Sequence, residues 1–105
     1  MRQIETAIMR STEIAKRGDN CGAWEGMERA YKQFPEDTKL NQLRANLSTE
    51  ASDFVRAIRT AQQLEAKGQT GASLAWYLKA QKLYPPSDFA QEGIQRLVQK
   101  VLPGS

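Results

Sequence analysis

Apolar residues recur every three or four positions along most of the chain, which is the spacing of one face of an α-helix. One such stripe runs through Phe54, Ile58, Ala61 and Leu64 and stops before Gly68, where a left-handed glycine can close a helix. A second helix is expected at about 71–84, because Pro85 lacks a backbone N–H and disfavours helical geometry in the residue before it. The pattern therefore predicts a helix, a glycine turn, and a helix that ends at proline.

The same pattern occurs twice, 50 positions apart, with no gap in the comparison. Residues 14–35 read IAKRGDNCGAWEGMERAYKQFP, and residues 64–85 read LEAKGQTGASLAWYLKAQKLYP. Glycine, alanine and proline take the same places in both copies, namely Gly18 and Gly68, Ala30 and Ala80, and Pro35 and Pro85. The chain is therefore interpreted as a duplicated helical unit.

Each copy has a glycine at the turn, a proline after the second helix, and small residues that let the two helices approach closely. A bulky side chain beside the small residues fills the remaining space. The positions are Ser11, Gly18, Ala23, Met27, Ala30 and Pro35 in the first copy, and Ala61, Gly68, Ser73, Tyr77, Ala80 and Pro85 in the second. This pattern resembles the tetratricopeptide repeat. The period differs, because that family repeats after about 34 residues. The resemblance implies antiparallel helix-turn-helix units.

The expected fold is a single all-α domain over 1–105, with tetratricopeptide-like repeats, a long central helix and a C-terminal capping helix. Its parts are a first repeat at about 3–35, a long helix at about 37–67, the second helix of the second repeat at about 71–84, and the capping helix at about 87–101. One continuous helix is favoured in the middle because neither glycine nor proline occurs between Pro35 and Gly68. The alternative is a break at NLSTEAS, where Ser48 or Thr49 would cap a new helix.

The composition argues against an enzyme. The chain has no histidine and one cysteine, Cys21, so histidine-based triads, Cys/His zinc sites and disulfides within the chain are excluded. No residue is predicted to be catalytic or to bind a metal or cofactor, and Cys21 is interpreted as a packing residue. No apolar run has the length of a membrane span or the form of a signal peptide, so we expect a soluble protein without membrane insertion; its compartment stays open.

The resemblance implies that the first helix of each repeat lines a concave surface, a place where such arrays receive a peptide or partner helix. The residues expected to contact a partner there are Thr12, Lys16, Arg56, Arg59 and Gln62. The net charge of +3 comes from the second half of the chain, so an acidic partner segment is favoured.

Trp76 is a further candidate contact residue. It stands where the first copy has Gly26, so the repeat does not require it. Its side chain is expected either to contact another chain or to cover the C-terminal helix near Phe89.

These features predict a non-catalytic protein-interaction module or scaffold. Two repeats are fewer than such arrays usually need, so a homodimer or a neighbouring domain is expected to complete the core. One alternative is a helical nucleic-acid-binding domain that uses the basic residues of the second half, although the sequence lacks the basic stripe that such binders carry. The other alternative is a purely structural bundle within a larger protein.

Overall fold

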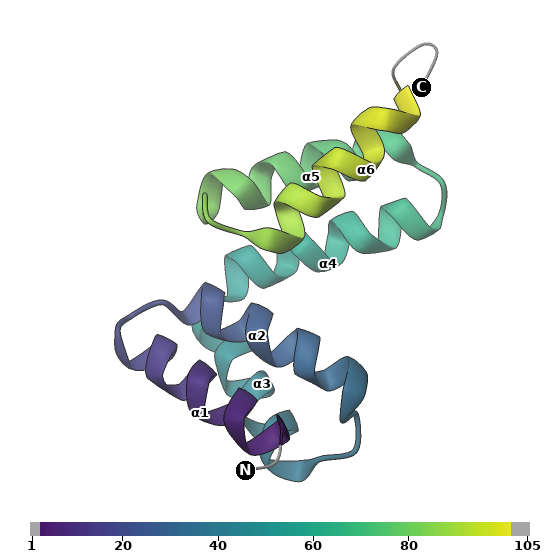
Figure 1. The fold of residues 1–105 in the computed structure, drawn as a ribbon. Helices are drawn as coiled ribbons and strands as arrows, with labels where there is room; N and C mark the ends of the chain where they lie inside the picture. The colour runs from purple at the N-terminus through teal and green to yellow at the C-terminus, as the bar shows by residue number, and fades with distance from the viewer. Residues whose placement is uncertain (1–2, 102–105) are drawn as a thin grey trace. The chain divides into compact units, whose positions relative to one another are not determined.

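The computed structural model describes residues 3–101, and within that range it contains helices and no strand, so the all-α prediction is confirmed (Figure 1). The helices are α1 (Gln3–Lys16), α2 (Asn20–Gln33), α3 (Thr38–Glu50), α4 (Ser52–Ala66), α5 (Thr70–Leu83) and α6 (Asp88–Val101).

The chain divides into two compact units, Met1–Ser52 and Asp53–Ser105. We call them the N-terminal and the C-terminal unit. Helices α2 and α5 begin 50 positions apart, and so do α3 and α6. The duplicated unit therefore contains three helices, and α6, which was expected as a cap, is the counterpart of α3. Three helices suffice for each unit to bury apolar residues of its own.

The expectation of one helix over 37–67 is wrong, because α3 ends at Glu50 and α4 begins at Ser52. Between them Ala51 leaves helical geometry, with φ −115° and ψ 37°. The break falls within NLSTEAS, but Ser48 does not cap a following helix. Its hydroxyl donates to the carbonyl oxygen of Arg44 at 3.0 Å, within the last turns of α3. Such a bond to the preceding turn bends and weakens a helix.

The turn between the first two helices of each unit has the same geometry in both copies. Gly18 and Gly68 take left-handed backbone angles, with φ 91° and 78°. The following N–H groups reach back in the same way, Asp19 to the carbonyl of Ile14 at 3.3 Å and Gln69 to that of Leu64 at 2.9 Å. A side chain would strain this conformation, so glycine is required at both turns.

The third helix of each unit begins at a side-chain cap in the same register. Asp37 Oδ1 accepts from the N–H of Leu40 at 2.9 Å, and Ser87 Oγ accepts from the N–H of Ala90 at 3.0 Å. Each cap stands shortly after the proline that ends the preceding helix. Different residues therefore perform the same capping function in the two copies.

Replacing Asp37 with alanine should lower the free energy of unfolding by about 1 kcal/mol, because the first turn of α3 loses its acceptor. Urea denaturation followed by circular dichroism measures the change. Asp37→Asn keeps an oxygen acceptor and should retain most of the stability. Equal losses in the two variants would contradict a capping role.

The two units fill corresponding parts of their cores with different pairs of residues. In the C-terminal unit the fully buried ring of Tyr77 lies against the backbone of Gly93, where an added Cβ would stand 2.5 Å from Tyr77 Cζ. In the N-terminal unit the corresponding positions hold Met27, which is fully buried, and Leu43. In the C-terminal unit the second helix therefore supplies the large residue, Tyr77, and the third helix supplies glycine. In the N-terminal unit the second helix supplies the smaller Met27 and the third helix supplies the larger Leu43.

Candidate protein-interaction surface

The exposed side of α5 is apolar and basic. Its exposed residues are Gly71, Ala72, Ala75, Leu78, Lys79, Lys82 and Leu83, and the helix contains no acidic residue. Leu78 and Leu83 each leave 47% of their surface to solvent. The apolar spacing of Leu74, Tyr77 and Leu78 predicts that Leu78 points inward. The structure instead exposes Leu78, and Ser73, Tyr77 and Ala80 form the buried face. Apolar residues on all sides of α5 hide which side is buried.

Trp76 lies half-buried at the edge of this surface, outside the buried core. Its ring centroid is 4.7 Å from Lys79 Nζ, within the range of a cation–π interaction. At an exposed site such an interaction contributes about 0.5–1 kcal/mol and holds the ring in place. The indole is therefore held by Lys79 and keeps part of its surface exposed.

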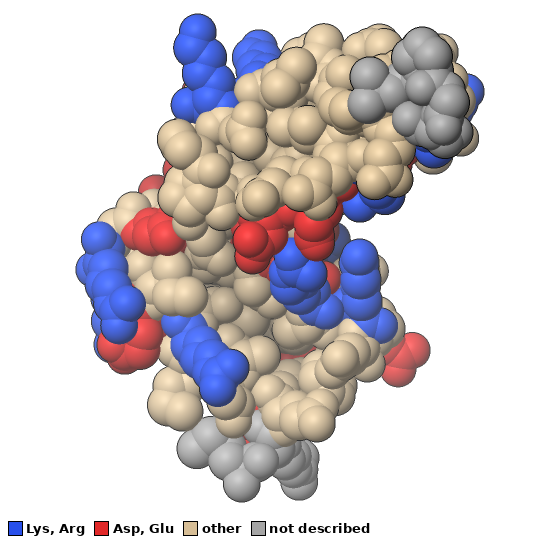
Figure 2. Space-filling view, turned by 45° about the horizontal axis from the view of Figure 1, so that its top comes forward, with Lys and Arg blue, Asp and Glu red and all other residues tan. Residues whose placement is uncertain are grey.

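The counterpart helix α2 lacks this character. Where α5 has Ala75, Leu78 and Leu83, α2 has Glu25, Glu28 and Gln33. The carboxylate of Glu28 is hydrogen-bonded to the guanidinium of Arg44 on α3. Figure 2 shows a broad uncharged area on the C-terminal unit, with Lys and Arg side chains and also Asp and Glu side chains at its margin. The apolar surface is therefore a property of one copy, and the duplicated fold alone does not require it.

The candidate residues on α4 form one group. Arg56, Arg59 and Gln62 are spaced three apart on α4 and are all exposed, whereas Ile58 and Ala61 between them are buried. They give α4 a polar and basic outer side.

The candidate residues on α1 are engaged within that helix. The Thr12 hydroxyl donates to the carbonyl oxygen of Ile8 at 2.8 Å. Lys16 Nζ lies 3.7 Å from Glu13 Oε1 in an exposed ion pair, which adds little stability. The polar groups of Thr12 and Lys16 therefore have hydrogen-bonding and charge partners within α1.

A polar cluster that the sequence did not predict joins the three helices of the C-terminal unit. The Tyr77 hydroxyl donates to Glu65 Oε1 at 2.8 Å. The Arg96 guanidinium donates two hydrogen bonds to the same carboxylate, from Nε to Oε2 at 2.9 Å and from Nη2 to Oε1 at 3.0 Å. The partners stand 12 and 31 positions apart, so no local spacing reveals them. The cluster fixes the buried side of α5 and so holds its outer side in position.

The cluster changes the protonation of its members. Burial, reinforced by the hydrogen bond to Glu65, raises the pKa of Tyr77 to about 12. The hydrogen bonds from Arg96 lower the pKa of Glu65, and Tyr77 contributes in the same direction. The carboxylate is therefore held in its charged form, as an acceptor for both partners.

Cys21 lies near the start of α2 in surroundings that disfavour a thiolate. Burial raises the pKa of its thiol, and the charges of Asp19 and Glu25 act in the same direction. A nucleophilic cysteine needs the opposite shift. Within residues 3–101, no cluster of three or more His, Cys, Asp or Glu side chains is placed to hold a metal ion.

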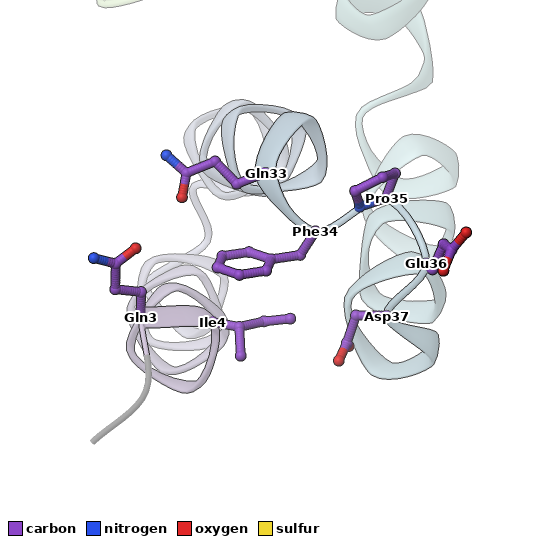
Figure 3. Close-up of a pocket in the computed structure, with 7 residues that line it drawn as sticks. All are labelled: Gln3, Ile4, Gln33, Phe34, Pro35, Glu36 and Asp37. Carbon is purple, nitrogen blue, oxygen red and sulfur yellow. The ribbon is translucent and has the colours of Figure 1, made fainter.

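A groove lies in the N-terminal unit, where the start of α1 meets the loop between α2 and α3 (Figure 3). This groove has a volume of about 740 Å³ and is lined by Gln3, Ile4, Gln33, Phe34, Pro35, Glu36 and Asp37. Figure 3 shows the Phe34 ring beside the Ile4 side chain, with Asp37 on the α3 side. The groove thus combines an apolar base with two acidic residues.

Within residues 3–101 the chain forms two three-helix units, with an apolar and basic surface on α5 and an apolar groove in the N-terminal unit. No family model matches the chain, and no match was found among the curated proteins or the solved structures. Among the described residues, no helix combines the length and apolar character needed to cross a membrane.

Proposed function

We propose that the chain is a non-catalytic protein-interaction module of tetratricopeptide-repeat type, and that it binds a partner protein or peptide through the exposed side of α5. The observation that carries the proposal is the exposure of Leu78 and Leu83 on a helix without acidic residues, with the half-buried Trp76 at the edge of the exposed side. The basic outer side of α4 is a second contact area on the same unit.

The chemistry of the α5 surface indicates the kind of partner. Leucine surface that remains in water is a source of binding free energy at about 25 cal/mol per Å² of apolar area removed from solvent. Tryptophan is enriched among the residues that dominate binding. Lys79 and Lys82 favour a partner with negative charges and speed its association. An acidic amphipathic helix meets these requirements.

Trp76→Ala should weaken binding roughly tenfold while costing the fold about 1 kcal/mol or less, since the side chain is only half-buried. The probe is a synthetic amphipathic helix with a leucine face flanked by glutamates, and fluorescence anisotropy of the labelled peptide measures its dissociation constant. Thermal melts measure the stability of each variant.

Two controls and a titration with RNA and DNA separate the interpretations. The same peptide with lysine in place of glutamate should bind more weakly, because the lysines of α5 would repel it. Arg56→Ala changes the α4 surface alone and should have a smaller effect than Trp76→Ala. Binding that is unaffected by Trp76→Ala, or salt-sensitive binding of RNA or DNA in place of the peptide, would contradict the proposal.

A further inference from the structure

The groove of the N-terminal unit corresponds to a closed, aromatic part of the C-terminal unit. Phe54 and Tyr84 stand 50 positions after Ile4 and Phe34. Their rings meet edge to face, with centroids 5.4 Å apart and planes at 75°, and Phe54 is only 2% exposed. In the N-terminal unit the smaller Ile4 takes the place of the phenylalanine. The groove therefore lies where this unit lacks one aromatic ring that its copy contains.

We infer that this groove binds a phenylalanine or tyrosine side chain of a partner peptide, with lysine or arginine beside it. The inference rests on the proposed function, since it gives the interaction module a separate contact on its N-terminal unit. The bound ring would lie against Phe34, in the arrangement that Phe54 adopts against Tyr84. Edge-to-face packing of this kind is a preferred geometry for aromatic pairs.

The size of the groove and the exposure of its base suit such a side chain. Its volume of about 740 Å³ falls in the range of ligand-binding clefts, about 300–1,000 Å³. Ile4 and Phe34 are both half-buried, so part of their apolar surface is open to a ligand. A bound ring would remove this surface from water.

The charges around the groove select the residues beside the ring. Among the described residues that line it, the charged ones are Glu36 and Asp37, and both are acidic. Asp37 caps α3 through Oδ1 and adds its negative charge to the rim. In the C-terminal unit the corresponding positions hold Pro86 and Ser87, which carry no charge. The negative rim is therefore particular to the unit with the open groove, and it favours a cationic flank.

The test uses the full chain and three capped tripeptides, Arg-Phe-Arg, Arg-Ala-Arg and Glu-Phe-Glu, in ¹⁵N NMR titrations. Arg-Phe-Arg should shift the amide signals of Gln33, Phe34, Glu36 and Asp37, and the other two peptides should bind roughly tenfold more weakly. Equal shifts with Arg-Ala-Arg, or none with Arg-Phe-Arg, would overturn the inference.

Ile4→Phe supplies the missing ring from within the chain. It should raise the melting temperature and abolish the response to Arg-Phe-Arg, as expected if the new side chain occupies the groove. Glu36→Gln keeps the groove and should weaken Arg-Phe-Arg binding about threefold, the size expected for one exposed charge. Undiminished binding by Ile4→Phe would place the ligand elsewhere.

The matched variant in the other unit is Phe54→Ile, which removes the ring from the closed copy and should lower the melting temperature without affecting the tripeptide signals of 33–37. Trp76→Ala should also leave those signals unchanged. A failure at the α5 surface is therefore distinguishable from a failure at the groove.

Discussion

Replacing Gly93 with alanine is expected to lower the free energy of unfolding by about 2 kcal/mol. The new Cβ would stand 2.5–2.7 Å from three atoms of the Tyr77 ring. The ring has no room to withdraw, since Tyr77 is fully buried and its hydroxyl is bonded to Glu65. Alanine favours a helix by up to about 1 kcal/mol over glycine, and this gain offsets only part of the clash. Urea denaturation at neutral pH measures the difference.

Two further variants show whether the clash is the cause. Gly71→Ala adds the same methyl group on α5 at a position with nothing within 4 Å, so it should cause no loss of stability. The double variant Tyr77→Met with Gly93→Leu introduces the residue pair of the N-terminal unit and should recover part of the stability lost in Gly93→Ala. A loss in Gly71→Ala as large as that in Gly93→Ala would exclude the contact with Tyr77 as the reason.

The C-terminal unit is also expected to lose about 2 kcal/mol of stability as the pH rises from 10 to 12 through ionisation at Tyr77. The pKa of Tyr77 is about 12 in the folded chain and about 10 in the unfolded chain. Between these values the unfolded chain releases the proton first, so rising pH favours unfolding. The stabilisation is fully present below pH 10.

Tyr77→Phe isolates this contribution, because it removes the ionisable hydroxyl group of Tyr77 alone. The variant loses the hydrogen bond to Glu65 at every pH, so the slopes of unfolding free energy against pH are compared, not the absolute values. The parent chain should show the steeper decline between pH 10 and 12. Equal slopes would mean that Tyr77 does not hold its proton more tightly in the fold.

The helices could be predicted wherever glycine and proline set their ends. Gly18 and Gly68 mark turns that need a left-handed residue, and Pro35 and Pro85 follow α2 and α5 closely. The break at Ala51 has no such marker. The break depends on whether nearby serine and threonine hydroxyls hydrogen-bond to the helix before them or to the helix after them. The sequence alone does not distinguish these two cases.

The candidate site was predictable in part. Trp76 stood out because Gly26 occupies its place in the first copy, and the structure puts it at the edge of the α5 surface. The side on which Leu78 lies was not predictable, since apolar residues surround α5. The groove had a signal in the sequence, because Ile4 aligns with Phe54, but the significance of that difference depends on the contact between Phe54 and Tyr84.

The two cores place their large and small residues on different helices. This difference disfavours mispaired intermediates during the folding of a duplicated chain. If α3 took the place of α6 during folding, Leu43 would meet the Tyr77 ring where only glycine fits. In the reverse exchange, Gly93 would face Met27 and leave a cavity. The third helix of each unit therefore packs well only in its own unit. This disfavours the exchange of third helices between the halves of one chain. It also disfavours domain swapping between neighbouring chains during synthesis.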